Sequence, residues 1–355
     1  MSEARDPVAD LRQIAFLLER AAEPTYRVRA FRTAAAVVDG LSADELAERT
    51  AAGTLSKLKG IGDVTARCVE ESLRGEEPVY LRRLLATEDE PLDEATAALR
   101  AALRGDCHAH SDWSDGGSPI EEMALAARTI GHEYLVLTDH SPRLTVANGL
   151  SAERLEKQLD VVAELNERFA AEAAAGDASP FRVLTGIEVD ILEDGTLDQK
   201  PSLLARLDVV VGSVHSKLRM PSAEMTPRMV AAVSNPNLDV LGHCTGRLVT
   251  GGRGTRPESE FDAELVFAAC AQFGVAVEIN SRPERLDPPK RLLRLAVEAG
   301  CVFSIDTDAH APGQLDWQRN GCERAARCGV DVGTIVNTWG RDDLLAWAAD
   351  HAHRP

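Results

Sequence analysis

Six short apolar runs alternate with longer amphipathic segments between Asp106 and about Ala348, and this alternation limits the possible fold more than any other feature. The runs lie at 134–138, 182–187, 209–214, 238–241, 275–279 and 302–305, and with a further strand expected at 106–110 they make about seven strands. Strand-sized apolar runs separated by helix-sized segments are typical of a parallel sheet covered by helices. We therefore predict an α/β fold for this region.

Histidine or acidic side chains follow nearly every run at its carboxyl end. A barrel of parallel strands collects these ends at one mouth, where barrel enzymes hold their active sites. The distribution therefore favours closure of the sheet into a barrel. Six of the nine histidines belong to this set, namely His108, His110, His140, His215, His243 and His310.

The spacing of these residues indicates a metal centre. His108 and His110 share one face of a strand because side chains alternate with a period of two, and Asp308 and His310 repeat that spacing. Glu188 ends the run at 182–187, and Asp115 lies in a Ser-Asp-Gly-Gly loop. Imidazole with carboxylate is the ligand set of Zn²⁺, Mn²⁺ or Fe²⁺. A single histidine at a strand end more often makes an ordinary hydrogen bond than binds a metal. His132, His351 and His353 lie outside the pattern, and we do not expect them to bind metal.

The first 85 or so residues have the apolar period of helices. Ile14, Leu17 and Leu18 mark one helix, the run from Phe31 to Val38 marks a second, and Ser42 is the expected N-cap of a third. We predict a small all-α domain at 1–90, a linker with a short helix at 91–105, and the α/β domain at 106–350.

Eight motifs in the α/β region resemble those of the polymerase and histidinol phosphatase (PHP) family, in the form attached to bacterial family X DNA polymerases. They are DCHAHSDWSDG at 106, LTDHS at 137, GIEVD at 186, GSVHS at 212, LGHCTGR at 241, EINSRPERLD at 278, SIDTDAH at 304 and NTW at 337. The resemblance implies a distorted (β/α)7, TIM-like barrel that binds up to three divalent metal ions.

The same resemblance assigns ligands residue by residue. It places one metal on His108, His110, Glu188 and Asp308, a second on Glu188, His215 and His243, and a third on Asp115, His140 and His310. His108, His110, Glu188, Asp308 and His310 are the residues we expect to be catalytic. Dications bridged by one carboxylate can bind and deprotonate a shared water for attack on a phosphate ester.

Residues beside the ligands supply further candidates. Asp139 and Asp306 are candidates for orienting imidazoles, although a purely structural role fits them equally well. Arginine matches phosphate oxygens with its planar fork, so the expected substrate contacts are Arg247, Arg253, Arg282 and Arg285.

The segment from Leu58 to Ala66, with Gly-Ile-Gly at its centre, resembles a helix-hairpin-helix, and TYRVRAFRTAAAVV at 25–38 resembles the amino-terminal domain of family X polymerases. A plain helical turn is the alternative for the glycines alone. Backbone N–H groups in such a hairpin approach DNA phosphates. The expected DNA contacts are therefore Lys59, Gly60 and Gly62, within a basic patch formed by Arg27, Arg29, Arg32, Lys57 and Lys59.

Two features limit the resemblance to a family X polymerase. Cys68 stands where lyase members carry a Schiff-base lysine, and a thiol cannot form the imine. Only about twenty residues separate the hairpin domain from the barrel region, which leaves no room for a polymerase palm. We therefore expect no polymerase activity.

Charge and cysteine content narrow the function further. A net charge of −18 argues against general adhesion to nucleic acid. The absence of any apolar stretch of membrane-spanning length and the seven scattered cysteines favour a cytoplasmic protein with reduced thiols and no membrane partner.

Two enzymatic hypotheses follow, both with a phosphate-ester substrate. The first is a metal-dependent phosphoesterase that binds DNA and acts at 3′ ends, as a 3′–5′ exonuclease or end-processing enzyme. The alternative is a small-molecule phosphomonoesterase of the histidinol-phosphatase type. A non-enzymatic module with a structural metal fits less well, because structural zinc sites are usually rich in cysteine. The sequence leaves the native metal, the substrate and the oligomeric state open.

Overall fold

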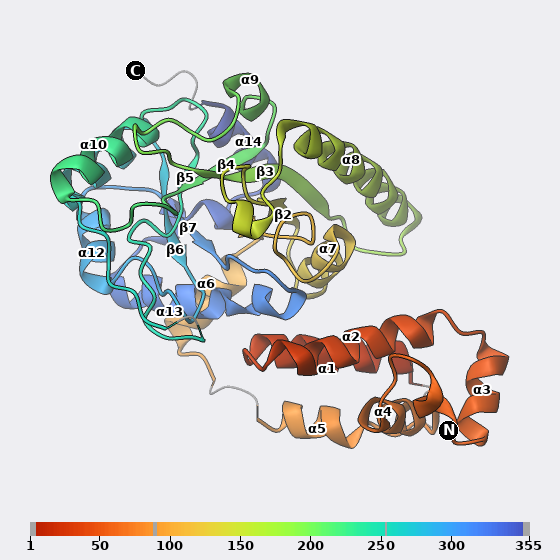
Figure 1. Ribbon diagram of the computed structural model, residues 1–355. Helices are drawn as coiled ribbons and strands as arrows, with labels where there is room; N and C mark the ends of the chain where they lie inside the picture. The colour runs from red at the N-terminus through yellow and green to blue at the C-terminus, as the bar shows by residue number, and fades with distance from the viewer. Residues whose placement is uncertain (1–4, 88–90, 253, 351–355) are drawn as a thin grey trace. The chain divides into compact units, whose positions relative to one another are not determined.

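The computed structural model describes residues 5–87, 91–252 and 254–350, and the chain forms two compact units, Met1–Pro91 and Leu92–Pro355 (Figure 1). We call these the helical unit and the barrel unit. Arg253, His351 and His353 lie outside the described residues. Among the described residues, no helix has the length and apolar character needed to cross a membrane.

The helical unit is built from short helices around one apolar core. Asp6 caps the first helix by accepting a hydrogen bond from the Val8 N–H, and Leu11, Ile14 and Leu18 pack with residues of the second helix such as Phe31. Its elements are α1 (Pro7–Arg20), α2 (Thr25–Asp39), α3 (Ala43–Ala51), the 3₁₀ turn η1 (Leu55–Lys57), α4 (Asp63–Leu73) and α5 (Val79–Leu85).

The predicted Gly-Ile-Gly turn connects η1 to α4. Gly60 has a φ of 100°, and a Cβ atom there would lie 2.8 Å from Cγ2 of Thr33 in α2. Glycine is therefore required at this position by both conformation and space. The Gly62 N–H donates to Oγ1 of Thr65 at 3.0 Å, which fixes the start of α4.

The barrel unit contains seven parallel strands paired in chain order from the first to the seventh. The strands are β1 (Gly105–Ala109), β2 (Tyr134–Leu137), β3 (Arg182–Asp190), β4 (Val209–Ser213), β5 (Val240–Leu241), β6 (Ala276–Asn280) and β7 (Phe303–Asp306). A parallel bridge between Ala109 and Ala309 brings the first strand beside the end of the last. The register of β1 shifts between Asp106 and Ala109, so the barrel is irregular there. The predicted distorted seven-stranded barrel is confirmed.

Helices cover the outside of the barrel (Figure 1). The longer ones are α7 (Ile120–Thr129), α8 (Ala152–Ala175), α10 (Ser222–Val233), α11 (Ala263–Phe273), α12 (Lys290–Glu298), α13 (Gln318–Cys328) and α14 (Arg341–Asp350). The shorter ones are α9 (Pro201–Leu204) and the 3₁₀ turns η2 (Thr145–Ala147), η3 (Pro312–Trp317), η4 (Val332–Thr334) and η5 (Val336–Thr338).

The segment expected to be a linker contains α6 (Glu94–Ala102), which packs against α13 and belongs to the barrel unit. The compact units divide at Pro91, whereas the sequence placed the start of the α/β domain at Asp106. The apolar positions Leu99 and Leu103 explain the difference, because both are buried in the largest core of the barrel unit.

One side chain, that of Asn337 at the start of the NTW motif, joins the first and last strands. Its Oδ1 accepts from the Ile305 N–H at 2.6 Å, and its Nδ2 contacts the Gly105 carbonyl at 3.3 Å and Oδ1 of Asp306 at 2.8 Å. The residue is fully buried. A buried polar group that loses its partner keeps its full desolvation cost, so this contact contributes strongly to closure of the barrel.

We therefore expect Asn337→Ala to lower the free energy of unfolding by about 3 kcal/mol, because it leaves the buried Ile305 N–H and the Asp306 carboxylate without this partner. Urea denaturation followed by circular dichroism measures the change. The control is Asn320→Ala, which removes one partly buried hydrogen bond to the Ser281 carbonyl and should cost about 1 kcal/mol. Equal losses in the two variants would contradict this role for Asn337.

Candidate metal centre

The inward-facing side chains of the strands change from apolar to polar toward the carboxyl ends. On β4 the inward positions are Val209, Val211 and then Ser213, and on β6 they are Ala276, Glu278 and then Asn280. The apolar members pack together inside the barrel. Because alternation puts every second residue on the same face, the polar side chains follow directly above this apolar floor and point into the barrel mouth.

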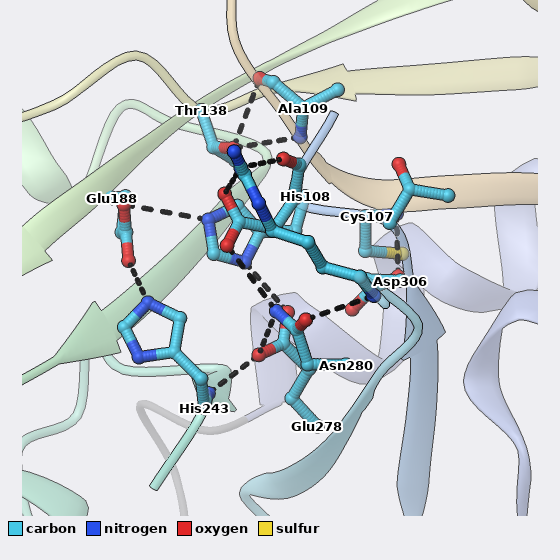
Figure 2. A network of polar contacts seen from close by, with 12 residues as sticks. Cys107, His108, Ala109, Thr138, Glu188, His243, Glu278, Asn280 and Asp306 are labelled. Carbon is cyan, nitrogen blue, oxygen red and sulfur yellow. Dashed lines mark hydrogen bonds and ion pairs between the residues drawn. The ribbon is translucent and has the colours of Figure 1, made fainter. Parts of the chain in front are cut away.

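Glu188 lies at the centre of this mouth. Its Oε1 atom is 2.9 Å from Nε2 of His243 and 3.2 Å from Nε2 of His215. Its Oε2 atom is 2.8 Å from Nδ1 of His140, 3.4 Å from Nε2 of His108 and 3.7 Å from Nε2 of His110. Figure 2 shows the carboxylate between His108 and His243. The two oxygens therefore face different groups of imidazoles, as a bridging ligand requires.

The remaining predicted ligands adjoin this group. Asp308 Oδ1 lies 3.5 Å from Nε2 of His110 and also 3.5 Å from Nδ1 of His310. Asp115 Oδ1 lies 3.3 Å from Nε2 of His310 and 3.4 Å from Nε2 of His140. The structure thus brings all nine predicted ligand residues together at one end of the barrel.

Ligand atoms within 4.8 Å of one another form three groups in the described residues. One contains His108, His110 and Asp308, and a second contains His140, Glu188 and His215. The third adds His110 to the expected Asp115, His140 and His310. Compared with the sets implied by the resemblance, the first group lacks Glu188 and the second contains His140 in place of His243. His140 belongs to two groups because its ring nitrogens face Glu188 and Asp115.

The buried polar atoms of this cluster fit divalent cations. Both oxygens of Glu188, both ring nitrogens of His110, His215 and His243, and Nε2 of His108 have no hydrogen-bond partner of suitable geometry among the described residues. Buried polar atoms are normally paired, because an unpaired one costs free energy. Carboxylate and imidazole atoms that converge without such partners are what a site for Zn²⁺, Mn²⁺ or Fe²⁺ requires.

The histidines of the cluster differ in their affinity for protons. Burial and the charge of Arg285 lower the pKa of His243 to about 4, and burial with neighbouring His310 and His140 lowers that of His110. Burial opposes a rise at His215, but Glu188 and Asp190 outweigh it and raise its pKa to about 9. The raised pKa of His215 reflects the negative charge of the buried carboxylates, which bound cations would neutralise.

The sequence analysis missed Glu278 and left the roles of two aspartates, Asp139 and Asp306, open. Glu278 Oε1 lies 2.6 Å from Nδ1 of His108. Asp139 contacts no imidazole through its carboxylate and instead accepts hydrogen bonds from Ser111, Ser114 and Gln158, which fixes the loop before Asp115. The sequence did contain a signal for Glu278. It is an acidic residue within a strand that is buried throughout, and it lies on the same face as Asn280, two positions later.

Asp306 also lies away from the imidazoles. Its Oδ1 accepts hydrogen bonds from the Cys107 N–H and from Asn337. It therefore joins β1 to β7 and takes the structural role that the sequence had left equally open.

Of the four predicted phosphate-binding arginines, three lie among the described residues, and two of these contact the cluster. Arg285 donates from Nε to Asp308 Oδ2 at 2.9 Å, and Arg282 Nη1 lies 3.0 Å from the Asp308 carbonyl and 3.1 Å from Nδ1 of His310. Arg247 donates instead to the backbone carbonyls of Arg285 and Leu286, so it holds a loop together. Arg253 lies outside the described residues. Arg282 and Arg285 are thus the two candidates at the cluster.

In the helical unit, Lys57, Lys59, Gly60 and Gly62 are exposed around the hairpin. Two members of the expected basic patch are neutralised by neighbours, because Arg27 pairs with Glu23 and Arg32 with Glu19, each at 2.8 Å. Cys68 is buried, and burial raises the pKa of its thiol to about 12. A buried, protonated thiol is unreactive, so this position serves the core.

We expect Glu188→Gln to weaken metal binding more than any other single substitution in the cluster, because both oxygens of the carboxylate face imidazoles. The loss of Zn²⁺ affinity should exceed about 100-fold. Substituting a residue that only hydrogen-bonds to a metal ligand already lowers affinity by about 10- to 100-fold, and Glu188 is expected to bind the metals directly. Metal content after dialysis against buffers of fixed free Zn²⁺ measures it. Glu193→Gln, at an exposed position soon after the same strand, is the control, and equal metal content in the two variants would contradict the bridging role.

Comparison with known proteins agrees with this geometry. Residues 106–282 match the PHP domain family, and residues 3–78 match a helix-hairpin-helix domain family. The DNA polymerase/3′-5′ exonuclease PolX of Bacillus subtilis is 37% identical over 245 residues, which cover 69% of this chain and 41% of the relative. The chain thus matches less than half the length of that protein.

Two other similarities each cover about two thirds of the chain. A probable phosphatase of Thermoanaerobacter sp. is 26% identical over 66% of this chain and 89% of its own length. The zinc-bound histidinol phosphate phosphatase of Lactococcus lactis is 17% identical, with a TM-score of 0.44 over 64% of this chain and 94% of that one. The predicted resemblance is confirmed for both parts of the chain. The chain carries a helix-hairpin-helix domain followed by a PHP domain, and its barrel belongs to the PHP family of metal-dependent phosphoesterases.

Proposed function

We propose that the barrel hydrolyses phosphate esters at DNA 3′ ends, as a 3′–5′ exonuclease or end-processing enzyme, with divalent metal ions held by the nine clustered residues. The observation that carries the hydrolytic part is the buried Glu188 carboxylate, which faces five imidazole rings without a hydrogen-bond partner of suitable geometry among the described residues. The helix-hairpin-helix domain on the same chain supports DNA as the substrate.

The side chains of the cluster would hold the metals in overlapping sets. His108, His110 and Asp308 would bind one ion, His215 and His243 a second, and Asp115, His140 and His310 a third, with Glu188 between the first two. When bound, the ions supply Lewis acidity, which activates a water and neutralises charge on the attacking and leaving oxygens of an in-line displacement. The protein contributes the fixed geometry and the exclusion of bulk water from the buried ligands.

Two arginines would complete the charge balance at the phosphate. Arg285 is nearly buried and fixes Asp308 through its Nε atom, while Arg282 lies between Asp308 and His310. Guanidinium groups at this edge of the cluster favour a dianionic or diester phosphate next to the metals. We assign them the role of substrate contacts.

The hairpin would bind the DNA backbone without reading its sequence. Lys57, Lys59, Gly60 and Gly62 are exposed on one turn, and α4 starts directly after it. Free backbone N–H groups at a helix start, with a small residue that allows close approach, suit a phosphate. This arrangement supplies local attraction even though the whole chain is acidic.

The alternative is a small-molecule phosphomonoesterase. The probable phosphatase of Thermoanaerobacter favours it, because the match to the barrel region covers nearly all of that relative. The two hypotheses share the metal centre and differ in whether the helical unit contributes to catalysis.

We expect the wild-type protein with Mn²⁺ or Zn²⁺ to shorten or clean 3′-labelled oligonucleotides, and His108→Ala to lower that rate by about 100-fold or more, the scale on which one charge-stabilising group acts in an active site. Steady-state rates on oligonucleotides and on a panel of phosphorylated metabolites separate the two hypotheses. If the protein hydrolyses a phosphate monoester but acts on none of the DNA ends tested, the small-molecule hypothesis is favoured and the DNA hypothesis is wrong.

Charge reversal at the hairpin tests the role of the helical unit. We expect Lys57→Glu with Lys59→Glu to weaken DNA binding and to flatten its salt dependence by about one unit of slope for each lost phosphate contact. Hydrolysis of a small phosphate ester should not change. Arg74→Glu, just beyond the far end of α4 and exposed, is the matched control. If both reversals affect DNA binding equally, the hairpin is not the contact.

A further inference from the structure

Glu278 is a buried carboxylate that contacts the metal cluster without belonging to any of its ligand groups. It lies on β6, is fully buried and faces the barrel interior. Its Oε1 atom is 2.6 Å from Nδ1 of His108. Its Oε2 atom accepts from the His243 backbone N–H at 2.5 Å and from Nδ2 of Asn280 at 3.2 Å (Figure 2).

The partners of Oε2 are fixed as donors. A backbone N–H can only donate, and the amide of Asn280 is oriented by the Arg282 N–H, which donates to its Oδ1 atom at 3.1 Å. Nδ2 of Asn280 therefore faces Glu278 and also lies 3.4 Å from Asp308 Oδ2. A carboxylate is the side chain that accepts on both oxygens without offering a proton.

The contact at Oε1 determines which nitrogen of His108 carries the proton. A neutral imidazole holds one proton, and a hydrogen bond from Nδ1 to a carboxylate keeps it on that side. The other nitrogen, Nε2, then presents a lone pair toward Glu188 Oε2, 3.4 Å away. That lone pair is what a metal ligand needs.

We propose that Glu278 is the positioning residue of the metal centre, because it holds His108 with its Nε2 lone pair toward the metals and fixes the backbone of His243 on the other side of Glu188. One carboxylate thereby orients a ligand on each side of the bridging residue. Nε2 of His243 lies 2.9 Å from Glu188 Oε1, so the two oriented imidazoles face opposite oxygens of the same bridge. This inference rests on the proposed metal centre and not on the identity of the substrate.

Glu278→Gln tests this assignment with almost no change in shape. The amide NH₂ group must face either the His243 N–H or Nδ1 of His108, since both oxygen positions meet donors. If it faces the backbone N–H, two donors oppose each other. If it faces His108, the imidazole moves its proton to Nε2 and loses the lone pair that points to the metals. Both arrangements weaken metal binding.

The first measurement is Zn²⁺ affinity of the full chain, determined as metal content at fixed free Zn²⁺. We expect Glu278→Gln to bind about 10- to 100-fold more weakly, the usual effect of losing the partner of a ligating histidine. Asp239→Asn is the matched control, because Asp239 is a buried carboxylate before β5 that accepts from the Val210 N–H, at the opposite end of the strands from the cluster. It should lower stability without changing Zn²⁺ affinity.

The second measurement does not depend on the folding of any Glu278 variant. Histidine-selective ¹⁵N NMR of the Zn²⁺-loaded protein, with His108 assigned through His108→Asn, should show a proton on Nδ1 and metal at Nε2. A proton on Nε2, or metal at Nδ1, would overturn the proposal even if Glu278→Gln fails to fold. Unchanged Zn²⁺ affinity in a folded Glu278→Gln would also overturn it. Neither result depends on activity toward DNA, so the proposed function stands or fails separately.

Discussion

The barrel depends on the burial of one carboxylate, Glu188, among five imidazole rings. An isolated buried carboxylate is strongly unfavourable, and here neighbouring imidazoles reduce that cost. Burial by itself would raise the pKa of Glu188, but His215, His108 and His140 together lower it. The fold brings imidazole rings from several strands close to this one carboxylate. A cluster of imidazole and carboxylate groups of this kind is suited to bind divalent cations.

The strand geometry achieves this through a change from apolar to polar side chains along the inward faces of β3, β4 and β6. Toward the amino ends the inward positions are apolar and form a tightly packed floor that includes Val136, Val209 and Val211. Gly186 lies between the floor and Glu188 on β3, and a Cβ atom there would lie 2.7 Å from Val136 and from the Val209 carbonyl. The missing side chain lets the floor close directly beneath the bridging carboxylate. The apolar residues that stabilise the barrel and the polar residues of the metal cluster therefore lie in successive layers of the same strands.

Much of this arrangement was predictable from sequence, for identifiable physical reasons. Strands buried on both faces are largely apolar, so six of the seven strands were visible as apolar runs, and the two-residue spacing of His108 and His110 placed both rings on one face of the first strand. The roles of Asp139, Asp306 and Glu278 were not predictable in the same way. Each depends on which distant strand or loop lies opposite it, as between Glu278 and His108, and period and spacing carry no such information. The same limit applies to Arg247, which binds backbone carbonyls rather than facing the cluster.

The acidity of the chain does not oppose a phosphate-ester substrate. A net charge of −18 is an average over the molecule, whereas a phosphate responds to charges within about a Debye length of 8 to 10 Å. A phosphate at the barrel mouth would lie near Arg282, Arg285 and the metal cluster, and a phosphate at the hairpin would lie near the exposed Lys57 and Lys59. The acidic remainder weakens attachment to nucleic acid elsewhere on the surface. Under the proposed function, weak attachment elsewhere on the surface would leave the metal cluster and the hairpin as the main sites of attraction for the DNA phosphates.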